Sequence, residues 1–239
     1  MVGQSGPMLP PESLCANASF RTIPPLVLGF SLFGFLFLSI AAMKVIWFSP
    51  ITADLDRLLG QGVIIFNLLV HIAIYVIPIA VCFVIGRVRQ PMAALGLSSA
   101  TAGKGLLIGS AISVLFLLKN FFAASISSMS DATIVMLIPS IVLGVMFYEI
   151  FYHGFLLPAL GVWLGFWPAL LIVSALAVII QTLNYLFSQS FDLFTSGRYL
   201  IETFVFSLIF GYLRCQTNSL WVGILPSWVS SWGMLNRIL

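Results

Sequence analysis

The sequence predicts an all-α polytopic membrane protein, a bundle of about seven transmembrane helices within a range of six to eight. Hydrophobic residues make up 61% of the 239-residue chain and charged residues only 7%, whereas a soluble domain carries roughly 25% charged residues. The mean hydropathy of +1.14 agrees with this low charge content. The apolar runs approach the roughly 20 residues that a helix needs to cross a bilayer, and they lack the period-two alternation typical of strands.

Seven apolar runs are the predicted transmembrane spans, and they cover residues 25–48, 62–85, 106–126, 132–157, 161–187, 199–213 and 220–235. Residues 1–24 form a polar leader, and residues 25–239 are predicted to form a single transmembrane helical domain. The loop after the second span carries Arg87, Arg89 and Lys104 and no acidic residue, so the positive-inside rule places this loop and the N-terminus in the cytoplasm. We expect the protein to lie in the cytoplasmic (inner) membrane of a bacterium.

The fourth span contains the strongest candidate site, in the stretch VMFYEIFYHGFLLPALG at residues 145–161. Glu149 lies there with His153 four residues later, and an ionisable residue at bilayer depth is costly and marks a candidate functional position. Residues four apart share one face of a helix, so the two side chains can form a hydrogen bond. Polar residues also recur in later spans and are expected to form hydrogen bonds between helices: Gln181, Asn184, Ser227, Ser230 and Ser231.

Three stretches resemble the motifs of one family. The run YEIFYHGFLLPAL resembles the first motif, E-E-x-x-x-R, of the CAAX-protease and bacteriocin-processing (CPBP, or ABI) family of intramembrane glutamic peptidases. The second motif, F-x-x-x-H, corresponds to VSALAVIIQ, and the third, H-x-x-x-N, to SLWVGILPSWVSS. The order and spacing of the three stretches fit that family from residue 145 onward. The resemblance implies a CPBP-like helical core at about residues 132–239.

Most of the polar motif residues differ from the family pattern. Tyr148 stands where the family has the glutamate that activates water, and tyrosine, with an ordinary pKa near 10, is a poor base at neutral pH. Glu149 is retained, while His153 replaces the arginine of the first motif. The residues at the two histidine positions and the asparagine position are Gln181, Ser227 and Ser231. The resemblance therefore implies a pseudoprotease in which Glu149 and His153 form a structural pair.

These observations favour a CPBP-like, CAAX protease-like protein without proteolytic activity, which acts as a helix-binding, scaffold or assembly subunit of a membrane complex. Its expected partners are membrane lipids and another membrane protein or transmembrane helix, and no basic cluster indicates nucleic-acid binding. One alternative is an active intramembrane glutamic endopeptidase that uses Glu149, His153 and Gln181. A second alternative is a pigment- or metal-binding subunit, with His71 as the candidate pigment ligand.

No cofactor and no metal site are predicted. A lipid or pigment is a candidate ligand for the space between the motif positions Glu149, Gln181 and Ser227. A metal site needs several converging ligands, and the chain has only two histidines. A Ser-His-Asp triad is not predicted either, because no G-x-S-x-G motif is present.

Overall fold

The computed structural model describes residues 18–48, 69–70, 72–123, 142–187 and 193–238. These residues form helices joined by short connections, and no strand is found among them, which confirms the predicted all-α fold. Predictions that fall on other residues, including His71, lie outside the described part of the chain.

The first half of the described chain contains a short 3₁₀ helix and four α-helices. Their bounds are η1 Ala18–Thr22, α2 Pro25–Phe48, α5 Ile77–Ile85, α6 Pro91–Leu95 and α7 Ser99–Ala123, with a π-helical turn, η2 Ile72–Val76, leading into α5. The second half begins with a helical segment, Val142–Leu164, that contains the π-helical turn η3 Ile150–Leu156 and then α9 Leu157–Leu164. The remaining helices are α10 Phe166–Phe187, α11 Leu193–Thr217 and α12 Trp221–Ile238.

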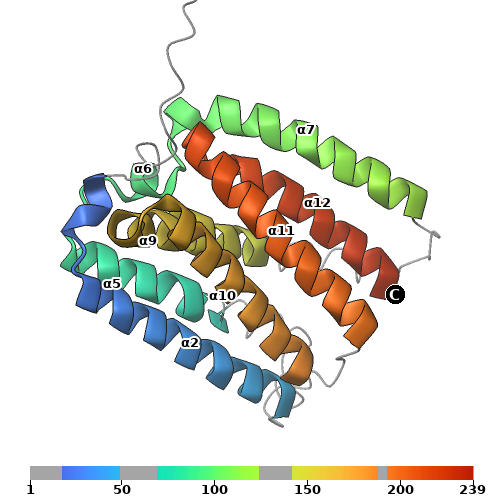
Figure 1. Ribbon diagram of the computed structural model, residues 1–239, viewed down its shortest axis with the longest axis horizontal. Helices are drawn as coiled ribbons and strands as arrows, with labels where there is room; N and C mark the ends of the chain where they lie inside the picture. The colour runs from blue at the N-terminus through green and yellow to red at the C-terminus, as the bar shows by residue number, and fades with distance from the viewer. Residues whose placement is uncertain (1–17, 49–68, 71, 124–141, 188–192, 239) are drawn as a thin grey trace, which may run out of the picture.

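The long helices pack side by side in two groups that meet at α10 (Figure 1). Helices α7, α12 and α11 lie together on one side of the bundle, and α2 packs against α5 on the other. Helix α10 contacts α11 and also α2, so it joins the two groups. The segment Val142–Leu164 contacts α10 through both α9 and η3, and η3 also contacts α11.

Four described helical segments are long and apolar enough to cross a bilayer: Pro25–Ala42, Pro91–Leu118, Val142–Leu164 and Phe166–Phe187. The chain is therefore an integral membrane protein. A shorter apolar helix, Ile72–Ile85, lies within the predicted second span.

Some predicted boundaries differ from the structure. Helix α2 matches the first predicted span, whereas α7 begins at Ser99, before the predicted start at residue 106. The fourth predicted span ends at residue 157, but the helix continues to Leu164, because Pro158 occupies the first turn of α9, where a missing N–H is tolerated. The helix is interrupted at Gly165, whose positive φ of +82° favours glycine.

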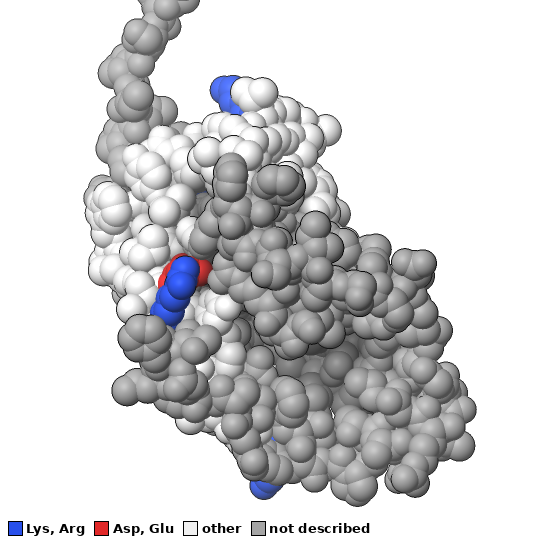
Figure 2. All heavy atoms as spheres, turned by 90° about the vertical axis from the view of Figure 1, so that its right-hand side faces the viewer, with Lys and Arg blue, Asp and Glu red and all other residues white. Residues whose placement is uncertain are grey.

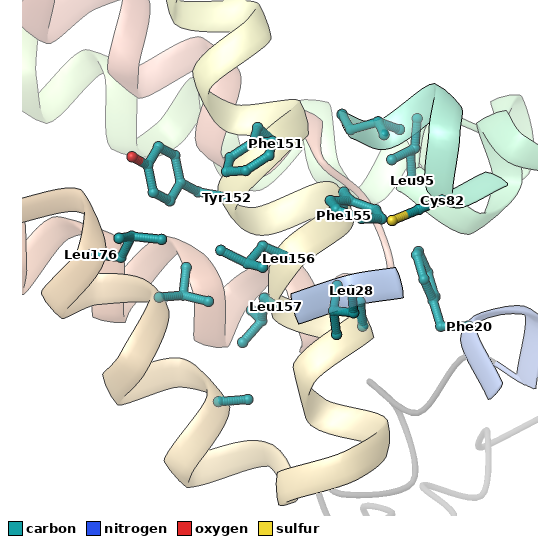
Figure 3. Packing of buried hydrophobic residues seen from close by; sticks show 14 of the residues in the cluster. Phe20, Leu28, Cys82, Leu95, Phe151, Tyr152, Phe155, Leu156, Leu157 and Leu176 are labelled. Carbon is teal, nitrogen blue, oxygen red and sulfur yellow. The ribbon is translucent and has the colours of Figure 1, made fainter. Parts of the chain in front are cut away.

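The core is rich in aromatic side chains that pack around the segment Val142–Leu164 (Figure 3). The rings of Phe35 and Phe151 stack with their centroids 4.1 Å apart. Figure 3 also shows the hydroxyl of Tyr152 pointing away from the neighbouring phenylalanine rings. The described end of the polar leader belongs to this core as well, since Phe20 is 0% exposed and packs against Phe83 and Phe155.

The surface is mostly apolar. Helix α2 exposes a stripe of large side chains spaced by three or four residues, Leu26, Phe30, Phe33 and Phe37, as expected for a helix face in contact with lipid. Figure 2 shows that the described surface on one face carries few charged atoms, and that acidic atoms in view lie beside basic ones. Arg198 and Glu202, four residues apart in α11, form an ion pair, with Nε donating to Oε1 at 3.2 Å.

Candidate functional site

The site lies where the segment Val142–Leu164 changes from α-helix to the π-helical turn η3. Pro158 follows this turn, and a proline lacks the N–H that would bond to the carbonyl four residues earlier, that of Gly154. The regular hydrogen-bond ladder is thus interrupted just after the two candidate residues. Glu149 immediately precedes η3 and His153 lies within it, and π-helical turns occur frequently at functional sites.

Glu149 and His153 form the predicted hydrogen bond, with His153 Nδ1 2.6 Å from Glu149 Oε2. An ionised carboxylate only accepts hydrogen bonds, so Nδ1–H is the donor. The other carboxylate oxygen, Oε1, accepts a hydrogen bond from Ser227 Oγ of α12 at 2.7 Å. The other ring nitrogen, Nε2, lies 3.1 Å from Ser207 Oγ of α11. This four-residue network therefore links three helical segments.

Three residues of the network are buried, and Ser227 is half-buried. Glu149 and His153 are each 1% exposed and Ser207 is 3% exposed. Burial of a charge costs several kcal/mol unless it is paired and its remaining acceptors are satisfied. Both carboxylate oxygens have a donor here, His153 at Oε2 and Ser227 at Oε1. The arrangement meets the physical requirement for keeping a carboxylate inside the bundle.

Two glycines allow the neighbouring helices to approach this closely. A Cβ atom on Gly223 of α12 would lie 2.6 Å from Glu149 Oε2, well inside contact distance. A Cβ atom on Gly211 of α11 would lie 3.4 Å from His153 Cδ2 and 2.5 Å from Leu170 Cδ1. Larger residues at these positions would hold α11 and α12 away from the buried pair.

Two other predicted site residues, Tyr148 and Gln181, lie outside this network. Tyr148 is half-buried, and its ring centroid lies 4.4 Å from that of Tyr152, a residue outside the hydrogen-bonded network. Gln181 is half-buried in α10 and makes none of the hydrogen bonds of Glu149 and His153. Ser231 lies in α12, but its side chain is outside the described part of the structure.

Sequence reasoning missed Ser207. It is 54 residues from His153 in the chain, and it is one of several serines buried between helices. No local pattern distinguishes it from the others. Its role as a hydrogen-bond partner of His153 follows only from the packing of α11 against η3.

Arg214 is a second buried polar feature, at the end of α11 just beyond the predicted sixth span. It is 4% exposed, and its guanidinium donates to Asn218 Oδ1 at 3.0 Å and to the carbonyl of Ala94 at 3.3 Å. Burial lowers the pKa of Arg214 to about 10, so the side chain stays cationic at neutral pH. Among the described residues, no group of three or more metal-ligating side chains is found.

Comparison with known families gives a match over residues 130–231. The matched family is described as Rce1-like: type II CAAX prenyl endopeptidase Rce1-like. This part of the chain is similar to an Rce1-like domain. The matched range agrees with the motif resemblance and contains all four residues of the buried network. Comparisons with curated proteins and with solved structures find no match.

Proposed function

We propose that the chain is a non-proteolytic, Rce1-like subunit of the bacterial cytoplasmic membrane, with its N-terminus in the cytoplasm. In this proposal the domain clasps a transmembrane helix of another membrane protein and serves as a scaffold or assembly subunit. The observation that carries the proposal is the state of Glu149, whose two carboxylate oxygens are both bonded inside the bundle.

Peptide hydrolysis by a glutamate requires a carboxylate that water can reach and that has a free acceptor for the proton. Glu149 is fully buried, with one oxygen bonded to His153 and the other to Ser227. Tyr148, at the family's water-activating position, packs against Tyr152 and is a poor base. Both features argue against cleavage by the family mechanism.

A helix partner fits the origin of such a domain. The matched family is described as an endopeptidase, and an endopeptidase domain must bind a stretch of polypeptide before cutting it. A domain that keeps the bundle but lacks the base retains the means to bind without cutting. Mutual packing of apolar helices is also the ordinary mode of association in a bilayer.

The test is purification from native membranes in a mild detergent, followed by mass spectrometry and partner quantification. We expect a stable, stoichiometric membrane partner that survives extensive washing. Tyr148→Phe serves as a matched variant, because it removes the hydroxyl at the base position while keeping the ring contact. This variant should retain the partner. Glu149→Gln should lower thermal stability, and neither the wild type nor Glu149→Gln should cleave a membrane-associated substrate.

The alternative, an active glutamic endopeptidase, is favoured by the family match itself. It predicts that the wild type cleaves a membrane-associated substrate and that Glu149→Gln does not. Cleavage of a membrane-associated substrate by the purified wild type, lost in folded Glu149→Gln, would establish the peptidase and refute the non-proteolytic proposal. A wild-type protein that purifies without any stoichiometric partner would refute the scaffold role.

A further inference from the structure

The buried network contains three groups in the order of a serine hydrolase triad. Ser207 Oγ lies 3.1 Å from His153 Nε2, and Glu149 Oε2 lies 2.6 Å from His153 Nδ1. The hydroxyl and the carboxylate therefore occupy opposite nitrogens of one imidazole. A nucleophile is activated by a hydrogen-bonded base, and the base is oriented by a third group, in the same geometry.

The acid member of this series is held in place independently of the histidine. Ser227 Oγ donates to Glu149 Oε1 at 2.7 Å, and Gly223 lets α12 close onto the carboxylate. With Nδ1–H bonded to the carboxylate, the neutral imidazole presents its Nε2 lone pair to Ser207. This is the tautomer that a general base for the serine requires.

Two other buried serines of the described chain are placed differently. Ser113 Oγ donates to the carbonyl of Gly109 in its own helix at 2.7 Å. Ser174 is fully buried, and its Oγ has no hydrogen-bond partner. Neither contacts an imidazole. They therefore serve as controls for the effect of burial alone on the reactivity of a serine hydroxyl.

We propose that Ser207 is a nucleophile, activated by His153 and oriented by Glu149, that accepts the acyl group of neutral, apolar carboxylic esters. The Ser207 proton passes to His153 Nε2 while Oγ bonds to the carbonyl carbon. The ester C–O bond then breaks, and His153 returns the proton to the departing alcohol. Water releases the acid from Ser207 by the same steps only slowly, because Ser207 is 3% exposed. This activity goes beyond the proposed function, because clasping a helix requires no nucleophile.

The surroundings set the substrate class and the expected rate. Near Ser207 on α11, Phe206 packs edge-on against Phe116 with centroids 4.9 Å apart and stacks on Phe210. Such an environment excludes charged acyl groups. Ser207 lies in the interior of α11, where its backbone N–H is used by the helix, so that N–H does not serve as an oxyanion donor. We therefore expect stoichiometric acylation of Ser207 and slow release.

The experiment uses the purified full-length protein in lipid nanodiscs and diisopropyl fluorophosphate, a small neutral reagent that partitions into apolar sites. Its P–F bond breaks as serine Oγ bonds to phosphorus, which leaves a mass tag that peptide mass spectrometry locates. We expect the tag on Ser207 and a stoichiometric burst of p-nitrophenol from p-nitrophenyl butyrate. Ser207→Ala should abolish both signals, and Ser174→Ala should leave both unchanged.

Three further variants separate activation from structure. His153→Gln should slow tagging about 100-fold, the usual contribution of a general base. Glu149→Asp should retain more of the rate than Glu149→Gln, because only the shorter carboxylate still orients the imidazole. Folding is checked for each variant by its detergent-unfolding midpoint. Only variants that remain folded are compared.

The proposal is overturned if folded wild type carries no tag on Ser207 while a known serine hydrolase in the same nanodiscs is fully tagged. It is also overturned if folded His153→Gln is tagged as fast as wild type, or if Ser174 is tagged as readily as Ser207. Partner retention by Ser207→Ala is measured in parallel. Its loss or persistence reports on the scaffold function, separately from the nucleophile.

Discussion

Gly223→Ala is the substitution that most directly tests the buried carboxylate. The added Cβ would lie 2.6 Å from Glu149 Oε2, while ordinary contacts begin at 3.4 Å, so the carboxylate or α12 must shift by about 0.8 Å. Such a shift stretches one of two short hydrogen bonds, of 2.6 Å to His153 and 2.7 Å to Ser227, beyond the range of a good bond.

The expected loss follows from two opposing effects. A hydrogen bond to a charged group contributes about 1.5–3 kcal/mol, and overpacking adds to its loss. Alanine in place of glycine within a helix returns roughly 0.5–1 kcal/mol. We therefore expect Gly223→Ala to lower the free energy of unfolding by about 1–3 kcal/mol.

The measurement is reversible unfolding by sodium dodecyl sulfate in mixed micelles, followed by circular dichroism. Gly103→Ala is the matched control, since a Cβ at this exposed position of α7 meets nothing within 4 Å. It should be neutral or stabilising. If Gly223→Ala proves as stable as Gly103→Ala, the close approach of α12 to Glu149 is wrong.

Three further substitutions test other contacts by the same unfolding assay. Ser227→Ala should lower stability by about 1–3 kcal/mol, because it leaves a buried carboxylate oxygen without a donor; an unchanged midpoint would contradict this. Gly96→Ala should lower stability, because its Cβ would meet the Arg214 guanidinium, 2.6 Å from Cζ, in addition to the strain of a left-handed backbone; an unchanged midpoint would argue against that contact. Tyr152→Phe should be neutral or stabilising, because it removes a buried hydroxyl that has no hydrogen-bond partner in the described structure; a clear loss would show that the hydroxyl is bonded.

Local features of the fold were predictable from sequence. Apolar runs of membrane-spanning length gave the all-α fold and the bounds of α2, and i, i+4 spacing gave the Glu149–His153 contact. Helix ends were harder, because a proline ends a helix in one context and begins one in another. Pro158 begins α9 within a continuing helix, and Gly165 rather than the proline separates α9 from α10.

The rest of the site depends on contacts between distant parts of the chain. Ser207 and Ser227 reach the pair across 54 and 78 residues, and no periodicity in the sequence relates positions so far apart. Motif alignment placed Ser227 at the site but also Gln181, which makes no hydrogen bond to Glu149 or His153. The register of α11 and α12 against η3 is set by small residues such as Gly223, whose importance emerges only from packing.

The burial of Phe20 sets an order for assembly during synthesis. This side chain precedes α2, yet its ring partners are Phe83 in α5 and Phe155 in η3. The ribosome must therefore extend the chain past Phe155 before the site for Phe20 is complete. Until then the Phe20 ring lacks its packing partners. Closing the loop between Phe20 and Phe155 carries a large entropic cost, so this contact is expected to form slowly. We expect the segment that contains Phe20 to pack onto the bundle late, after the central helices have inserted into the membrane.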